Sequence, residues 1–164
     1  MDKKIEKAKA KKDIKALAKI LLKNKNVSLR MQAASALGDL GGEEAFDFLV
    51  KALYDNEEMV SRSAAKALAL MGQEKAIGPL LQAFEQCAID TLGAEWAFKV
   101  IGEKAFPSII AAYKSSNYKI NLANLIIGLQ CVDAAPLIKK DLEKGVFEAY
   151  DTRFLRFFVE KHEN

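Results

Sequence analysis

A phrase of small and apolar residues occurs twice in this chain, and the two copies lie 31 residues apart. Residues 33–45 read AASALGDLGGEEA and residues 64–76 read AAKALALMGQEKA, with the same residue at seven of thirteen positions. A sequence that repeats itself at roughly 20–50 residues is typical of proteins in which one small unit stacks on copies of itself. The spacing therefore predicts a repeat architecture.

Each copy of the phrase contains the end of one predicted helix and the start of the next. Apolar residues at 31, 34, 37 and 40 recur every three positions and so share one stripe of a helix. Gly41 and Gly42 follow, and glycine commonly ends helices because it adopts the left-handed backbone conformation at little cost. Glu43 and Glu44 come next, where acidic side chains meet the positive end of a helix dipole. The predicted unit is helix, tight turn, helix.

Less exact copies extend the pattern in both directions. Residues 94–113 form a third copy after a one-residue deletion, residues 121–142 form a fourth, and residues 13–24 represent the second helix of an earlier one. Proline is tolerated in the first turn of a helix, where its missing N–H has no intrahelical partner. The prolines of the chain all fall two or three residues after the alanine that opens a second helix: Pro79, Pro107 and Pro136.

The repeated phrase resembles the HEAT-like repeats of phycobilisome lyase-type proteins. Their usual phrase is Val-Arg-x-x-Ala-Ala-x-Ala-Leu-Gly-x-Ile-Gly, followed by Ala and a proline. Residues 29–45 are similar to it nearly throughout, and residues 60–80 are similar with the arginine displaced to Arg62. The resemblance implies an all-α fold, a right-handed α-α superhelix of the HEAT-like or armadillo type, with about four to five hairpins and roughly ten helices.

We expect residues 1–164 to form a single HEAT-like repeat domain. Residues 1–12, which are nearly all Lys, Glu and Ala, are expected to be a polar N-terminal cap, and residues 13–142 to hold the repeats. Residues 145–164 are expected to be one aromatic-rich helix, because aromatic residues recur there every three or four positions: Phe147, Tyr150, Phe154, Phe157 and Phe158. That helix could cap the fourth repeat, or it could mediate self-association through Phe154, Phe157 and Phe158.

The sequence offers little that could support catalysis. The one histidine is His162, and Cys87 and Cys131 lie 44 residues apart, so neither a nucleophile–histidine pair nor a zinc site of ordinary spacing is expected. Both cysteines lie in or beside apolar helical segments and are predicted to be buried, in a reducing compartment. Trp96 and Tyr113 are predicted to belong to the core. We therefore expect no enzyme activity, no cofactor and no metal.

Hydropathy and composition favour a cytoplasmic protein. Apolar residues make up 51% of the chain, which argues against disorder. The longest apolar runs are interrupted by Lys, Glu or Gly, so no membrane span is expected. The basic N-terminus also lacks the apolar stretch and cleavage site of a secretory signal.

Charge is distributed unevenly along the chain. The net charge is +3, but residues 1–25 contain ten lysines against only Asp2, Glu6 and Asp13. Such a segment could bind nucleic acid, or it could be the solvated end of a helical stack. No aromatic residue lies among these lysines to stack on bases, so nucleic acid is the less favoured partner.

Protein binding or scaffolding is the predicted function. In a solenoid the second helices of the repeats are expected to line the concave face, and their polar positions would form its floor. These positions are Lys15, Lys19, Asp47, Lys51, Gln82, Ser108 and Lys139. Two alternatives stay open, namely nucleic-acid binding through the Lys-rich N-terminal region and, from the resemblance, a bilin lyase-type accessory subunit.

Overall fold

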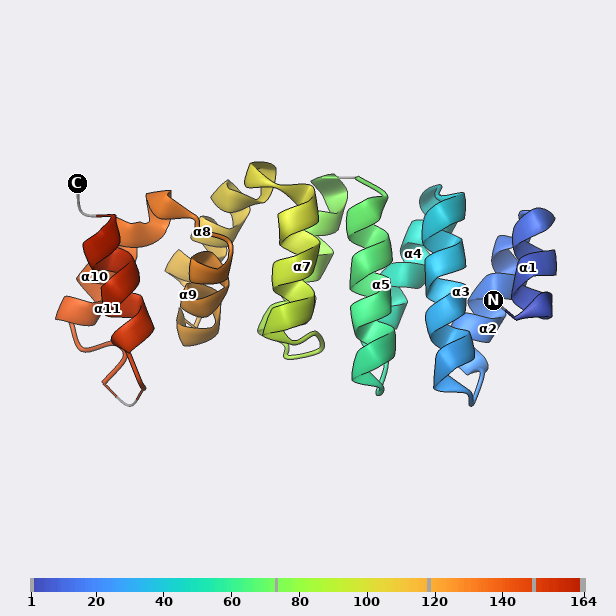
Figure 1. Cartoon of the computed structure of the whole chain (residues 1–164), viewed down its shortest axis with the longest axis horizontal. Coiled ribbons are helices and arrows are strands. Elements are labelled where there is room, and N and C mark those ends of the chain that lie inside the picture. The colour runs from blue at the N-terminus through green and yellow to red at the C-terminus, as the bar shows by residue number, and fades with distance from the viewer. Residues whose placement is uncertain (1, 73, 118, 149, 163–164) are drawn as a thin grey trace. The chain divides into compact units, whose positions relative to one another are not determined.

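The computed structural model describes residues 2–72, 74–117, 119–148 and 150–162. Within these ranges the chain forms eleven α-helices and no strand (Figure 1), which confirms the all-α prediction of roughly ten helices. The chain divides into two compact units, residues 1–101 and residues 102–164.

The first unit is built from helical hairpins. Its helices are α1 (Lys3–Ala10), α2 (Ile14–Lys23), α3 (Val27–Leu40), α4 (Glu43–Ala52), α5 (Glu58–Leu70), α6 (Ile77–Glu85) and α7 (Thr91–Ile101). Asp2, Asp13 and Asn26 each accept a backbone hydrogen bond with their side chains and so fix the starts of α1, α2 and α3.

The odd-numbered helices of this unit form one row, here called the first-helix row. In it α1 packs on α3, α3 on α5 and α5 on α7, and Figure 1 shows these four helices side by side. The second-helix row consists of α2, α4 and α6, which pack against the first-helix row. Each hairpin therefore contacts its neighbour in sequence, and the expected stacking is confirmed.

Small residues allow the helices of the first-helix row to approach closely. The alanine pairs of the repeated phrase are buried, and so are Leu37, Leu68 and Phe98. The tightest point lies at Gly38 of α3. A Cβ atom placed there would lie 2.8 Å from the Cβ of Ala67 on α5, closer than two carbon atoms can pack.

The turn chemistry predicted from the phrase is also confirmed. α3 ends at Leu40, and both Gly41 and Gly42 have positive φ angles, 69° and 86°, that glycine adopts readily. Glu43 and Glu44 lie in the first turn of α4. All three prolines occupy the first turn of a second helix, namely of α6, of α8 (Phe106–Ser115) and of α10 (Ala135–Glu143).

The first hairpin is more complete than the sequence indicates. Residues 3–10 form helix α1, which buries Ile5 and Ala8, whereas only the second helix of this copy was expected. The apolar stripe of α1 consists of these two side chains among exposed lysines, and so short a stripe gives a weak periodic signal. Its outer side is polar.

The second unit contains α8, α9 (Lys119–Gly128), α10 and α11 (Arg153–Lys161). α8 packs on α9, and α11 packs on both α9 and α10. The prediction of one helix over residues 145–164 is wrong, because α11 begins at Arg153. A turn at Gly145, with φ of 73°, separates α10 from the rest and places Phe147 in the core outside any helix. Residues 163 and 164 lie outside the described residues.

The aromatic side chains of α11 point in two directions. Phe158 is buried with Leu155 and Val159, so its predicted part in self-association is wrong. Phe154 and Phe157 are 74% and 66% exposed. One side of α11 therefore covers the core of the second unit, and the other leaves two phenylalanines in solvent.

The two cysteines differ in their surroundings. Cys131 is buried as predicted, and burial raises the pKa of its thiol. The prediction is wrong for Cys87, which is exposed. α6 ends at Glu85, and Cys87 adopts the left-handed conformation, with φ of 56°, so it no longer follows the apolar stripe of that helix.

Candidate functional site

The residues predicted to bind a partner are all exposed. Five lie on the second-helix row of the first unit and two lie in the second unit: Lys15 and Lys19 on α2, Asp47 and Lys51 on α4, Gln82 on α6, Ser108 on α8, and Lys139 on α10. The five residues of the first unit therefore lie on the second helices of their repeats, as expected. A role for these side chains in binding stays a prediction.

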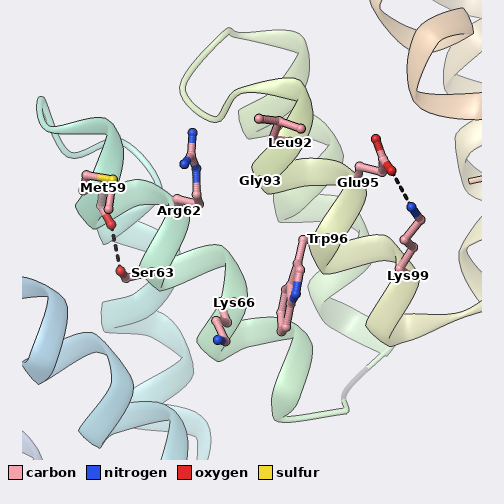
Figure 2. A pocket seen from close by; sticks show the side chains of 9 residues that line it. All are labelled: Met59, Arg62, Ser63, Lys66, Leu92, Gly93, Glu95, Trp96 and Lys99. Carbon is pink, nitrogen blue, oxygen red and sulfur yellow. Dashed lines mark hydrogen bonds and ion pairs between the residues drawn. The ribbon is translucent and has the colours of Figure 1, made fainter. Parts of the chain in front are cut away.

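A groove lies on the first-helix row, between α5 and α7 (Figure 2). Its volume is about 450 Å³. α5 contributes one wall and α7 the other, through Met59, Arg62, Ser63 and Lys66 on the first and Leu92, Gly93, Glu95, Trp96 and Lys99 on the second. We call this hollow the α5–α7 groove.

The groove exists because α7 carries two apolar stripes. Ala94, Ala97 and Phe98 are buried, whereas Leu92 and Trp96, one turn apart, are 67% and 38% exposed. The prediction that Trp96 belongs to the core is wrong, although Tyr113 is buried as expected. The inner stripe satisfies the packing of the repeat, so the outer stripe is left for solvent. An apolar spacing of four at 92, 96 and 100 could have indicated it.

Trp96 and Lys66 meet at one end of the groove. Figure 2 shows Trp96 on α7 and Lys66 on α5. The Nζ of Lys66 lies 4.9 Å from the centroid of the Trp96 ring, a cation–π distance. In the part of the chain that the structure describes, Lys66 makes no ion pair with a carboxylate.

Arg62 holds the other end of the groove. Its guanidinium donates to Asp90, with an Nη2–Oδ2 distance of 2.9 Å, and also pairs with Glu58 one turn earlier. Asp90 in turn accepts from the backbone N–H of Gly93 at 3.0 Å, at the start of α7. A Cβ atom at position 93 would lie 2.8 Å from Asp90 Oδ1, so glycine permits this contact.

A second hollow adjoins the groove along the same row. It lies between α3 and α5, has a volume of about 620 Å³ and shares Ser63 and Lys66 with the α5–α7 groove. Its walls are more polar, since Gln32, Ser35 and Asp39 line the α3 side. Asp39 pairs with Lys9 of α1 at 2.5 Å. The first-helix row thus carries two adjacent hollows with Lys66 between them.

Ion pairs join the two helices of a hairpin near the point where the second helix ends. In the first unit Arg30 pairs with Asp55 at 2.8 Å, and only 10% and 11% of these side chains is exposed. Arg62 and Asp90 repeat the arrangement in a more exposed position. In the second unit Lys119 of α9 donates to Asp141 of α10 at 2.6 Å. A lysine there replaces the arginine of the repeated phrase.

Tyr113 joins the pair formed by Lys119 and Asp141. Its hydroxyl donates to Asp141 at 2.9 Å, and burial together with this bond raises the pKa of Tyr113 far above its usual value. Burial acts to raise the pKa of Asp141 too, but hydrogen bonds from Lys119 and Tyr113 outweigh it, so the net shift is downward. Asp141 is therefore held as a carboxylate.

The described ranges hold no cluster of three or more His, Cys, Asp or Glu side chains arranged as metal ligands. None of their helices has both the length and the apolar composition needed to cross a membrane.

Comparison with known proteins bears on the fold rather than on a particular activity. The family model described as HEAT repeats matches residues 14–99, which is more than half of the chain and runs from α2 into α7. No curated protein matches the sequence. The match, which agrees with the stacked hairpins of the first unit, shows that this chain belongs to the HEAT-repeat family.

Proposed function

We propose that this chain is a non-enzymatic protein-binding or scaffolding module and that the α5–α7 groove receives the partner. HEAT repeats commonly mediate protein interaction. The observation that carries the proposal is the exposure of Trp96 beside Met59 and Leu92 on one surface. Exposed apolar clusters mark interaction sites, and tryptophan is enriched among the residues that contribute most to binding energy.

The exposed polar positions of the second-helix row are the alternative binding face. They include Lys51 and Gln82, and their charges are mixed, which also suits a protein partner. We favour the groove because apolar side chains left in solvent gain free energy when a partner covers them, whereas isolated exposed charges contribute little. Self-association through Phe154 and Phe157 stays a further prediction.

The cytoplasm remains the proposed location. Cys87 and Cys131 are both free thiols, as expected in a reducing compartment. The lysines of residues 1–25 remain a possible contact for nucleic acid, but that segment has no aromatic residue on which bases could stack.

Site-specific photo-crosslinking distinguishes the two faces. A photoreactive amino acid replaces Leu92 in one protein and Gln82 in another, and each is irradiated in a lysate of the source organism. Both positions are exposed, on α7 and α6 respectively, so they are matched controls for each other. We expect Leu92 to give a defined crosslinked protein, identified by mass spectrometry, and Gln82 to give none above background.

The identified partner then provides a binding measurement. Trp96→Ala should weaken its affinity at least tenfold, about 1.4 kcal/mol, whereas Lys51→Glu combined with Gln82→Glu should change it less than twofold. A partner captured from Gln82 alone, or lost only with the second-helix variant, would transfer the function to the second-helix row.

A further inference from the structure

The walls of the α5–α7 groove are more basic than acidic. Its lining contains three cationic side chains, Arg62, Lys66 and Lys99, and one carboxylate, Glu95. Lys99 is paired with Glu95, and Arg62 is paired outside the lining with Asp90 and Glu58. Lys66 differs from both, because within the described residues the partner of its ammonium group is the ring of Trp96.

A carboxylate is the group that this arrangement would attract. An ammonium over an aromatic ring keeps its charge and can still accept a hydrogen-bonded anion on its outer side. A partner that covers Met59, Leu92 and Trp96 would exclude water from the groove, so a charge pair formed under it would gain more than one in open solvent. The site is therefore complementary to an acidic residue that carries apolar neighbours.

The walls also restrict the backbone of an occupant. They are helices, whose backbone N–H and C=O groups are already paired, so they offer no edge on which an extended peptide could add a strand. A helix satisfies its own backbone and can lie in a hollow between two others. Leu92, Trp96 and Val100 follow one another by single turns of α7, over about 12 Å, and match apolar side chains spaced by four on a facing helix.

We propose that the α5–α7 groove binds an acidic amphipathic helix of a protein partner. Its apolar face, about two turns long, would rest on Met59, Leu92 and Trp96, and a Glu or Asp beside that face would pair with Lys66. This inference rests on the proposed function and adds the chemistry of the partner to it.

The probes that test the inference are two synthetic peptides. Each is a side-chain-stapled helix of about 14 residues with leucines at i, i+4 and i+7, because short helices are marginal without a constraint. One peptide carries Glu and the other Lys at the remaining exposed positions. Trp96 is the only tryptophan of the chain, so its emission reports directly on the groove, and calorimetry provides an independent readout.

We expect the acidic peptide to bind the full chain with a dissociation constant of about 10–100 µM and the basic peptide to bind at least tenfold more weakly. Raising the ionic strength from about 0.05 M to 0.5 M should reduce this preference. Lys66→Gln should weaken the acidic peptide about fivefold or more and remove most of the preference. Lys114→Gln, at an exposed lysine on α8, is the matched control and should change neither.

Equal binding of the two peptides, no binding of either, or equal effects of Lys66→Gln and Lys114→Gln would overturn the inference. If Leu92 still crosslinks a partner while the acidic peptide fails, the proposed function stands and only the partner chemistry is wrong. If Leu92 crosslinks nothing and the acidic peptide fails, both are wrong.

Discussion

At the scale of single residues, small side chains determine how closely the repeats stack. Gly38 of α3 faces Ala67 of α5 at a separation that leaves no room for a methyl group. Position 38 is helical, so the need for glycine comes from the neighbouring helix and not from the backbone conformation. The sequence of a single repeat could not predict this close contact, because it forms between two copies.

Gly38→Ala tests this close contact. Alanine normally stabilises a helix by about 0.5–1 kcal/mol over glycine, but here the overlap with Ala67 should reverse the sign and destabilise the protein by about 1–3 kcal/mol. Gly78→Ala is the control, since it lies in α6 and a Cβ there meets nothing within 4 Å. Urea denaturation followed by circular dichroism measures both. A Gly38→Ala protein as stable as Gly78→Ala would show that α3 and α5 are not so close.

At the scale of elements, α7 has one apolar side that packs and a second that the proposed function assigns to a partner. Its inner stripe of Ala94, Ala97 and Phe98 keeps the spacing of the repeat, so its outer stripe is unconstrained by the fold. Leu92 and Trp96 occupy that outer stripe. Apolar residues there do not contribute to the core, which is the physical reason to look for a partner on this side.

In the second unit Tyr113 of α8 and Lys119 of α9 both donate to Asp141 of α10. The stability that these contacts provide should depend on pH. The pKa of Asp141 is lowered in the folded chain. Its contribution to folding stability is therefore present above the unfolded pKa of about 3.9 and is lost as the pH falls through the lower folded value. At pH 7 Asp141→Asn should accelerate amide hydrogen exchange in α9 and α10 about tenfold or more.

Two comparisons check the origin of that effect. The difference between Asp141→Asn and the natural chain should shrink as the pH drops below about 4, because both then lack the carboxylate charge. Asp133→Asn, at an exposed carboxylate in the same unit, should leave exchange in α9 and α10 unchanged. A difference that is constant from pH 7 to pH 3 would contradict the ionic account.

At the scale of the whole molecule, periodicity predicted the fold but not the site. Local rules that every repeat obeys predict the glycine of the turn, the positions of the prolines and the burial of Phe98. The apolar spacing at 92, 96 and 100 indicates a second stripe on α7, but it does not say which of the two stripes faces solvent. An apolar residue on a helix that is apolar on two sides can face the core or solvent, and its direction depends on the register of α7 against α5.

Residues 145–164 also show that spacing alone does not determine which side chains are buried. Aromatic spacing alone placed Phe147 and Phe158 on one helix, although Phe147 lies between α10 and the start of α11 at Arg153, and both side chains are buried. Lys119 illustrates the reverse case. The sequence lacks the expected arginine in this repeat, yet a lysine from the start of α9 still reaches Asp141. Pairing across a hairpin depends on distance between elements, which sequence spacing does not report.

The most direct test of the account is hydroxyl-radical footprinting of the full chain, free and bound to the partner identified by crosslinking. The account predicts strong protection of Trp96 and Met59, whose side chains line the α5–α7 groove, and unchanged oxidation of the exposed Leu22 on α2 and Tyr54 after α4. Protection of Leu22 and Tyr54 with Trp96 and Met59 unchanged would contradict it.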